Sequence, residues 1–337
     1  MSPRKPSVTA QDVARLAGVS RAVVSRALSR NGSISPDARA RVLRAAEELG
    51  YQVNFLAQGL NRQRSHLIGV IVSRISDPFR STLLDALLNE IQRHGFQALV
   101  SEIHSEQDLA HTLRRFTQFR VSGVIVTSGQ PPEALVNECV QQHIPVVGIN
   151  RQPTIPGVDY VCSDNVAGAE LAADQLLRSG CRRFGWLNHS PSTWAGRMRG
   201  EAFSRALQAR GVDVERNLAI LACPEEGYTG GFQAAALADE ALEGIFCANA
   251  QIACGFLDGM RQRGKQAPED YQLIGFDNTP PTAQYSYQLT TLHQDVAAIS
   301  RQALARLQER TVDPLQPSRT TWVEVTLIHR RTSPFVI

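Results

Sequence analysis

Short apolar runs alternate with longer amphipathic stretches from about residue 66 to the C-terminus. The runs are rich in Val, Ile and Leu and too short for helices, which is typical of strands buried on both faces of a parallel sheet. They cover residues 67–72, 98–100, 123–126, 146–149, 183–187, 244–247 and 273–276. Between them, apolar residues recur at helical spacing, and we expect helices near 78–94, 107–119, 132–143, 165–179, 197–211, 227–239, 250–264 and 294–310. This βαβα order predicts doubly wound parallel sheets, and the number of units predicts two of them.

The first fifty residues have a different pattern, in which polar cap residues separate three shorter amphipathic stretches. The caps Thr9, Ser20 and Ser35 predict helices over 10–17, from 21 to about 28 and over 36–49. We expect their inward faces to carry Val13 and Leu16, then Val23, Val24 and Leu28, then Val42, Leu43, Ala46 and Leu49. Two short helices joined by a turn at Gly18 predict a helix-turn-helix, although a generic three-helix bundle would share this pattern.

In a helix-turn-helix, the start of the second helix presents side chains to base edges in the major groove. An arginine fork there can donate two hydrogen bonds to guanine, whereas hydroxyl and amide groups donate to phosphates and position the protein. The base-reading candidates are Arg21, Ala22 and Arg26. Further expected DNA contacts are Thr9, Ser20, Ser25 and Asn31.

Charge is distributed unevenly along the chain. Residues 1–64 contain eleven Lys and Arg against four Asp and Glu, a net charge of +7, whereas the remainder has 24 against 28, a net charge of −4. A basic segment on a mildly acidic body favours a polyanion as the partner of that segment alone. No apolar run is long enough to span a membrane and no signal peptide opens the chain, so we expect a cytoplasmic protein.

Motifs of catalysis and metal binding are missing from the sequence. It contains no G-x-S-x-G, H-E-x-x-H or Walker-type loop, and its eight histidines show no i,i+4 pairing. The six cysteines stand singly in apolar or mixed stretches, without a C-x-x-C pair, and we interpret them as small buried hydrophobic residues. We therefore expect no enzyme activity, no cofactor and no metal site.

The stretch VTAQDVARLAGVSRAVVSRALSRNGSISPDARARVLRAAEELGY resembles the DNA-binding headpiece of the lactose-repressor (LacI/GalR) family, and NFLAQGLNRQRSHLIGVIVS resembles its hinge helix and entry into the core. The similarity continues to the C-terminus. It implies a headpiece at 1–53, a hinge at 54–65 and a core at 66–337 with the fold of periplasmic sugar-binding proteins. The core would have an N-terminal lobe (about 66–163 and 294–322) and a C-terminal lobe (about 164–293 and 323–337). Its crossovers are expected near Asp164, His293 and Trp322.

The resemblance also gives a role to residues 54–61. In the family this segment is a short helix that orders on the operator and wedges a leucine into the minor groove, and Leu60 falls on that position, with Ala57 one turn earlier. An ordinary flexible linker is the alternative. Five residues depart from the family pattern: Val23, Ser29, Val53, Gln58 and Ala250. These departures affect the expected operator affinity, the hinge geometry and the placement of Asn249.

Ligands of doubly wound sheets bind beyond the carboxyl ends of the strands, so candidate contacts follow the apolar runs. The resemblance supports four of them directly: Phe79, Arg197, Asn249 and Asp277. Asn150, Asp164 and Trp194 complete the candidate set. Carboxylate, guanidinium and aromatic groups together suit a polyol, although Asp277 could cap a turn, Arg197 could pair at the surface and Trp194 could serve packing.

Together these observations predict a homodimeric transcription regulator, with a repressor as the expected type, that binds a pseudo-palindromic operator and a small-molecule effector. The resemblance makes a sugar or a sugar acid the expected effector. No heptad repeat precedes Ile337, so we expect no coiled-coil tetramer. A sugar-binding protein without a regulatory DNA role would explain the core equally well, but not the basic headpiece. An enzyme on a doubly wound fold would need a set of catalytic residues, and the motifs of such a set are missing from the sequence.

Overall fold

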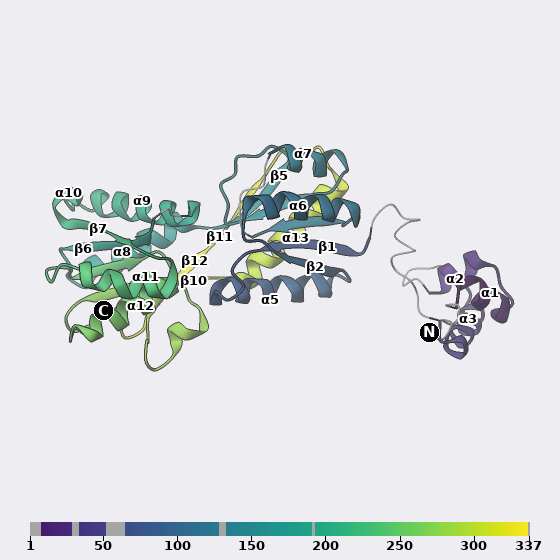
Figure 1. The fold of residues 1–337 in the computed structure, drawn as a ribbon, viewed down its shortest axis with the longest axis horizontal. Helices are drawn as coiled ribbons and strands as arrows, with labels where there is room; N and C mark the ends of the chain where they lie inside the picture. Colours follow the sequence, from purple (N-terminus) through teal and green to yellow (C-terminus); the bar gives the residue numbers. More distant parts are fainter. Residues whose placement is uncertain (1–7, 29–33, 52–64, 128–132, 191–192, 336–337) are drawn as a thin grey trace. The chain divides into compact units, whose positions relative to one another are not determined.

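The computed structural model describes residues 8–28, 34–51, 65–127, 133–190 and 193–335 (Figure 1). The chain divides into two compact units, Met1–Ser65 and His66–Ile337. Asn31, Ala57 and Leu60, together with the substituted positions 29, 53 and 58, lie outside the described residues. No helix among the described residues is both long and apolar enough to cross a membrane.

The described residues of the smaller unit form the helices α1 (Ala10–Ala17), α2 (Arg21–Ala27) and α3 (Pro36–Leu49). Thr9 and Asp12 form a reciprocal capping box at the start of α1, and Gly18 and Gly50 end α1 and α3 with φ of 63°, a left-handed conformation that glycine adopts without strain. The small core of this unit is centred on Val13, Val24 and Val42 with adjacent alanines. The predicted helices and their caps are therefore confirmed.

Two of the expected inward residues are wrong. Leu16 is 47% exposed and Leu43 is 50% exposed. Ala17 and Ala45 are buried in the same helices instead. Short helices that pack closely have room only for small side chains where they touch. The prediction from apolar spacing favoured the larger leucine beside each of these alanines and was therefore wrong.

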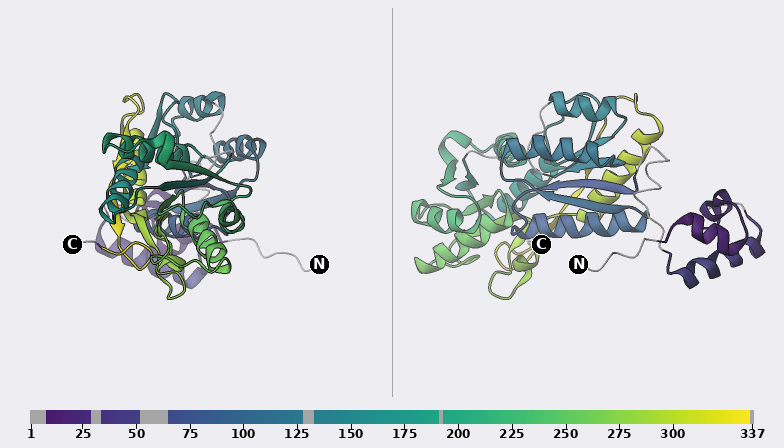
Figure 2. Two further views of the ribbon diagram at one scale, coloured as in Figure 1. Left: turned by 90° about the vertical axis from the view of Figure 1, so that its left-hand side faces the viewer. Right: turned by 45° about the vertical axis from the view of Figure 1, so that its right-hand side comes forward.

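One lobe of the larger unit is built on a parallel six-stranded sheet in the order β11-β5-β4-β3-β1-β2. Its strands are β1 (Leu67–Val72), β2 (Gln97–Glu102), β3 (Gly123–Val126), β4 (Val146–Ile149), β5 (Val158–Ser163) and β11 (Thr320–Val323). Its helices are α5 (Pro78–Arg93), α6 (Glu106–Gln118), α7 (Glu133–Gln141) and α13 (Val296–Val312). Apolar residues of α5 and α13 form one core cluster and those of α6 and α7 another, so helices cover both faces (Figures 1 and 2).

The other lobe is built on a second six-stranded sheet in the order β12-β10-β9-β8-β6-β7, parallel except for β12. Its strands are β6 (Phe184–His189), β7 (Leu218–Cys223), β8 (Gly244–Cys247), β9 (Gln272–Asp277), β10 (Thr290–Gln294) and β12 (Val325–Ile328). Its helices are α8 (Asn165–Arg178), α9 (Trp194–Ala209), α10 (Val214–Asn217), α11 (Gly227–Ala234) and α12 (Ala250–Gln262). Helix α8 packs beside α9, and α11 packs beside α12. The expected fold, two doubly wound lobes, is confirmed.

The close packing of α11 on α12 explains Gly231 and Gly255. A Cβ on Gly231 would lie 2.1 Å from the carbonyl oxygen of Ile252, and one on Gly255 would lie 1.9 Å from that of Tyr228. Side chains at these positions would force the helices apart. Gly230 has another neighbour, because a Cβ there would lie 1.7 Å from the carbonyl oxygen of Glu225, before α11.

The chain passes between the sheets three times, at Asp164 after β5, at Asp295 after β10 and at Glu324 between β11 and β12. Five strands were not among the apolar runs singled out in the sequence: β5, β7, β10, β11 and β12. Several of these are short or begin with paired threonines, as at Thr290-Thr291 and Thr320-Thr321, so they lack a continuous apolar run. All six cysteines are buried with free thiols, as small hydrophobic residues are.

Candidate functional site

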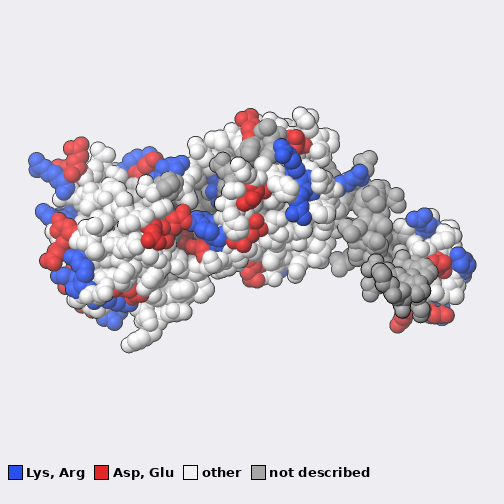
Figure 3. Space-filling view, in the orientation of Figure 1, with Lys and Arg blue, Asp and Glu red and all other residues white. Residues whose placement is uncertain are grey.

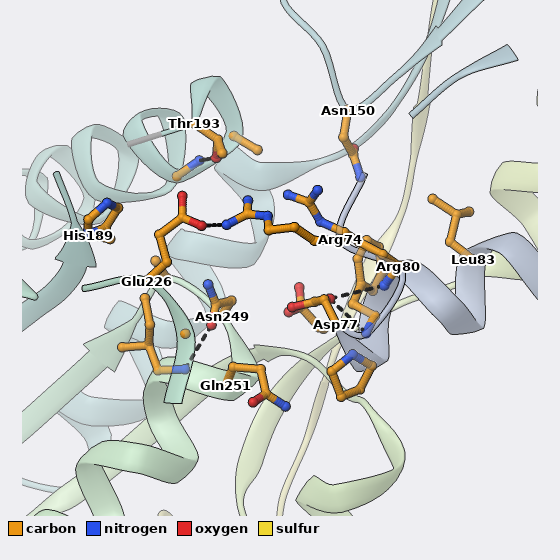
Figure 4. Close-up of a pocket in the computed structure, with 18 of the residues that line it drawn as sticks. Arg74, Asp77, Arg80, Leu83, Asn150, His189, Thr193, Glu226, Asn249 and Gln251 are labelled. Atoms are coloured by element: carbon orange, nitrogen blue, oxygen red, sulfur yellow. Dashed lines mark hydrogen bonds and ion pairs between the residues drawn. The ribbon is translucent and has the colours of Figure 1, made fainter. Parts of the chain in front are cut away.

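A cavity of about 390 Å³ lies where the carboxyl ends of strands from both sheets meet. It is within the size range of small-molecule sites. It is lined by the loops after β1, β3, β4, β6, β7 and β8, by the last residues of β9 and β10, and by the first turns of α5, α9 and α12 (Figure 4). On the face of the larger unit in Figure 3, positive and negative side chains are interspersed.

The wall from the second lobe is organised around Asp277, the last residue of β9. Its backbone has a φ of 89°, and its carboxylate accepts hydrogen bonds from Gln294 Nε2 at 2.7 Å and from the backbone N–H of Ala250 at 3.3 Å. Arg199 on α9 approaches the carboxylate at 3.7 Å. The Arg199 guanidinium also lies 3.4 Å above the ring of Phe276, so packing as well as charge holds it in place.

Burial decides the electrostatics of this pair. Removal from water raises the pKa of Asp277 to about 6, although the positive charge of Arg199 opposes the change. Burial likewise lowers the pKa of Arg199 to about 10, against the attraction of Asp277. Arg199 remains charged at neutral pH and donates to Asn165 Oδ1 at 2.7 Å and to the Ala248 carbonyl at 2.6 Å. The protein's donors therefore do not occupy every acceptor position of the Asp277 carboxylate, which can accept further hydrogen bonds from the hydroxyl groups of a ligand.

The wall from the first lobe carries three arginines, Arg74, Arg80 and Arg151. Arg74 follows β1 and forms an ion pair across the cavity with Glu226, which precedes α11 (Figure 4). Arg80 lies in the first turn of α5 and donates to the Ser73 carbonyl at 3.0 Å. Arg151 follows β4 and donates to the carbonyl of Thr127. This wall is cationic.

Hydrogen bonds join the two lobes beneath the cavity. Gln294, at the end of β10, donates to Asp277 and accepts from Asn150 Nδ2 at 3.1 Å and from the Ser163 hydroxyl at 2.5 Å. Asn150 Oδ1 accepts from the backbone N–H of Ser163 at 2.8 Å. Residues at the strand ends of both sheets thus share one network.

Four of the seven effector candidates line the cavity, namely Phe79, Asn150, Asn249 and Asp277. Asn249 caps α12 by accepting from Ile252 N–H at 2.9 Å with Oδ1, so its Nδ2 is the group that can donate to a ligand.

Three candidates do not line the cavity, and each has a different role. Asp164 caps α8 by accepting from Ala167 N–H at 2.9 Å. The Trp194 ring packs 6.4 Å from that of Trp322, centroid to centroid. Arg197 is exposed, because the buried face of α9 carries Gly196, Arg199 and Phe203 instead. The arginine predicted at position 197 is thus replaced in the cavity by Arg199.

Sequence reasoning also missed Arg74, Arg80, Gln294 and Glu226. A helical wheel of α9 would have identified Arg199, since it shares one face with Ala195, Ala202 and Phe203. No comparable signal marks the others, because their approach depends on how strands from distant parts of the chain are ordered.

The predicted base-reading residues lie on the exposed surface of α2. Arg21, Ala22, Ser25 and Arg26 are all exposed, whereas Val24 and Ala27 are buried. Thr9 and Ser20 are exposed caps, which accept from the backbone N–H groups of Asp12 and Val23. This surface is open to a partner.

Comparisons with known proteins find a matching family model for each unit. Residues 9–54 match the model of bacterial regulatory proteins, lacI family, and residues 173–333 match a periplasmic binding protein-like domain. The HTH-type transcriptional regulator GalS of Salmonella typhimurium is 31% identical over 327 residues, which cover 96% of each chain.

Two solved structures show the same fold. The lac repressor dimer bound to operator and the anti-inducer ONPF has a TM-score of 0.84 at 22% identity, covering 98% of this chain and 100% of that one. A LacI family transcriptional regulator from Enterococcus faecium with bound ribose has a TM-score of 0.72 at 26% identity, covering 80% of this chain and 100% of that one. The relatives are transcription regulators and not enzymes. With a helix-turn-helix unit, a two-lobed core and a full-length relative above 30% identity, the chain belongs to the LacI family of DNA-binding transcription regulators.

Proposed function

We propose that this regulator is a repressor that binds a pseudo-palindromic operator as a homodimer and responds to a small-molecule effector, a sugar or a sugar acid, in the cavity between its lobes. One observation carries the proposal: the same chain has an exposed basic surface on α2 and a polar cavity lined by residues from the strand ends of both sheets. The lac repressor solved as a dimer on operator, and the relative solved with ribose, support it by analogy. Such a protein acts in the bacterial cytoplasm, where its DNA is.

In this proposal Arg21, Ala22 and Arg26 read bases, and Thr9, Ser20, Ser25 and Asn31 contact the backbone. Ala57 and Leu60 belong to the hinge of residues 54–65, between a headpiece at 1–53 and the core. The effector contacts are Phe79, Asn150, Asn249 and Asp277, with Arg199 taking the part first expected of Arg197.

The effector acts through a shift between two arrangements of the lobes, which it binds with different affinity. The hydrogen bonds that join Asn150, Gln294 and Asp277 connect the two lobes beside the cavity. A change in the arrangement of the lobes would therefore alter these hydrogen bonds. A coupling free energy of about 1–3 kcal/mol would change operator affinity from several-fold to about a hundredfold.

The test is selection of DNA from a random pool by the purified protein at moderate salt. We expect an enriched palindrome of roughly 16–20 base pairs, as two headpieces on successive turns would require. Enrichment only in the presence of an added metabolite would assign a corepressor. If no motif is enriched under any condition, the headpiece binds only the phosphate backbone, without sequence specificity, and the proposal is wrong.

A further inference from the structure

The cationic wall of the cavity holds more positive charge than its own acids balance. Among the described residues that line the cavity from the first lobe, Arg74, Arg80 and Arg151 face one carboxylate, Asp77. That carboxylate is already engaged, because its Oδ1 accepts from the backbone N–H groups of Phe79 at 3.0 Å and Arg80 at 3.1 Å. The wall therefore has a net charge of +2, which falls to +1 when the ion pair of Arg74 with Glu226 of the other lobe is included.

These arginines lie close enough to repel one another. Burial lowers the pKa of Arg80, and the charge of Arg74 lowers it further. Burial, and then the charge of Arg80, lowers the pKa of Arg151 to about 10. Guanidinium groups keep their positive charge in proteins, so the folded protein holds like charges together in a partly dry site. An anion placed among them would remove this repulsion.

One donor in the cluster has no partner among the residues that the structure describes. Arg151 Nε is buried and makes no hydrogen bond to any of them, while another nitrogen of the same guanidinium donates to the carbonyl of Thr127. A buried donor without an acceptor costs about 1–3 kcal/mol. Oxyanions are suitable acceptors, because a guanidinium fork matches the spacing of phosphate and carboxylate oxygens.

The opposite wall has different chemistry. Asp277 and Glu226 supply acceptors there, and Asn249 supplies an amide donor. A ligand that satisfies both walls has an oxyanion at one end and hydroxyl groups at the other. A neutral sugar would bring no negative charge to the arginine cluster.

We propose that the effector is an anionic polyol, in which a phosphate ester or a carboxylate binds Arg80 and Arg151, with Arg74 beside them, and the hydroxyl groups bind at Asp277. This inference rests on the proposed function for the existence of an effector and adds its charge. The positive charge of the wall favours an anion, and the test separates the two sources of oxyanion.

The experiment measures thermal unfolding of the full chain in inorganic phosphate, in acetate and in chloride at equal ionic strength and pH. Tryptophan fluorescence is the signal, because all three tryptophans, Trp186, Trp194 and Trp322, lie in the larger unit and report its unfolding alone. The variants are Arg80→Gln and Arg151→Gln. Arg205→Gln is the matched control, since it removes one positive charge from the exposed face of α9.

We expect phosphate or acetate to raise the midpoint temperature of the wild type and of Arg205→Gln above the value in chloride. In Arg80→Gln and Arg151→Gln the apparent affinity for the anion should fall at least about tenfold. Each variant is compared with itself in chloride, so a change in its own stability does not obscure the result. The larger effect of phosphate would assign a phosphate ester, and the larger effect of acetate would assign a carboxylate.

The inference is overturned if neither anion stabilises the wild type beyond chloride, or if both cavity variants respond as the control does. Operator selection on the same preparation keeps this result apart from the proposed function. A protein that selects a palindrome but ignores anions remains a repressor with a neutral effector, whereas one that binds anions but selects no DNA contradicts the repressor.

Discussion

At the scale of single residues, the cavity depends on a buried charge pair that the protein only partly satisfies. Arg199 has three kinds of partner: a carboxylate, neutral acceptors and an aromatic ring. Asp277 has two neutral donors and a distant guanidinium. Breaking such a pair by removing one partner is destabilising, because the other charge stays buried.

Arg199→Gln should therefore destabilise the larger unit by about 3–5 kcal/mol. Arg205→Gln, on the exposed face of the same helix, should change the free energy of unfolding by no more than about 0.5 kcal/mol. Urea unfolding followed by tryptophan fluorescence measures both. Equal losses in the two variants would mean that Arg199 does not occupy the buried position.

Asp277 predicts a pH dependence of stability. Its pKa is about 6 in the folded protein against 3.8 for a solvent-exposed aspartate, so between about pH 4 and pH 6 the folded carboxyl keeps a proton that the unfolded chain releases. The stability that this proton contributes is present below about pH 4 and is lost as the pH rises through 6.

Asp277→Asn lacks this titration. The free energy of unfolding of the variant minus that of the wild type should rise by roughly 1–3 kcal/mol between pH 4 and pH 7. Urea titrations at intervals of half a pH unit would measure the difference. A difference that is constant, or that falls with pH, would contradict a raised pKa.

At the scale of elements, local signals and packing decide different things. Caps and apolar spacing predicted α1, α2 and α3, because Thr9, Ser20 and Ser35 satisfy backbone N–H groups whatever the rest of the chain does. The direction that a helix faces depends on its neighbours, so Leu16 and Leu43 were assigned to the wrong side. The same limit misassigned Arg197 on α9.

The capping box of α1 can be tested by substitution. Thr9→Ala removes the side-chain acceptor for Asp12 N–H and should reduce the stability of α1 by about 1 kcal/mol, whereas Thr9→Ser keeps the acceptor and should stay near wild type. Amide hydrogen exchange of residues 10–17, read by mass spectrometry, isolates this helix from the larger unit. Exchange in Thr9→Ala as slow as in Thr9→Ser would show that the cap contributes little.

At the scale of the whole molecule, regulation requires the two units to influence one another through the segment between them. The structure describes each unit by itself, and the residues at 52–64 lie outside the description. The proposed wedge at Leu60 therefore rests on the family resemblance. Its physical content is that unstacking a base step is offset by contacts that bent DNA allows.

Leu60→Ala should weaken binding to the selected operator by at least about tenfold while leaving binding to random DNA unchanged, because phosphate contacts do not depend on the wedge. Fluorescence anisotropy titrations on both DNAs at one salt concentration would measure the ratio. Leu67→Ala, in β1 of the larger unit, is a control for loss of an apolar side chain near the segment. An equal loss on operator and random DNA would exclude the wedge.

The sequence by itself determined the class of each part, since periodicity, caps and strand-end polar residues depend on neighbours within a few positions. It determined the helix-turn-helix, the two doubly wound lobes and the placement of Phe79, Asn150, Asn249 and Asp277 at strand ends. Only the tertiary structure decided which side of α9 is buried, and hence Arg199 rather than Arg197. It alone brought Arg151, which follows β4, to the wall that carries Arg74 and Arg80 after β1, because β4 and β1 come together only through the order of the sheet. Charge gathered across such distances in sequence leaves no local pattern.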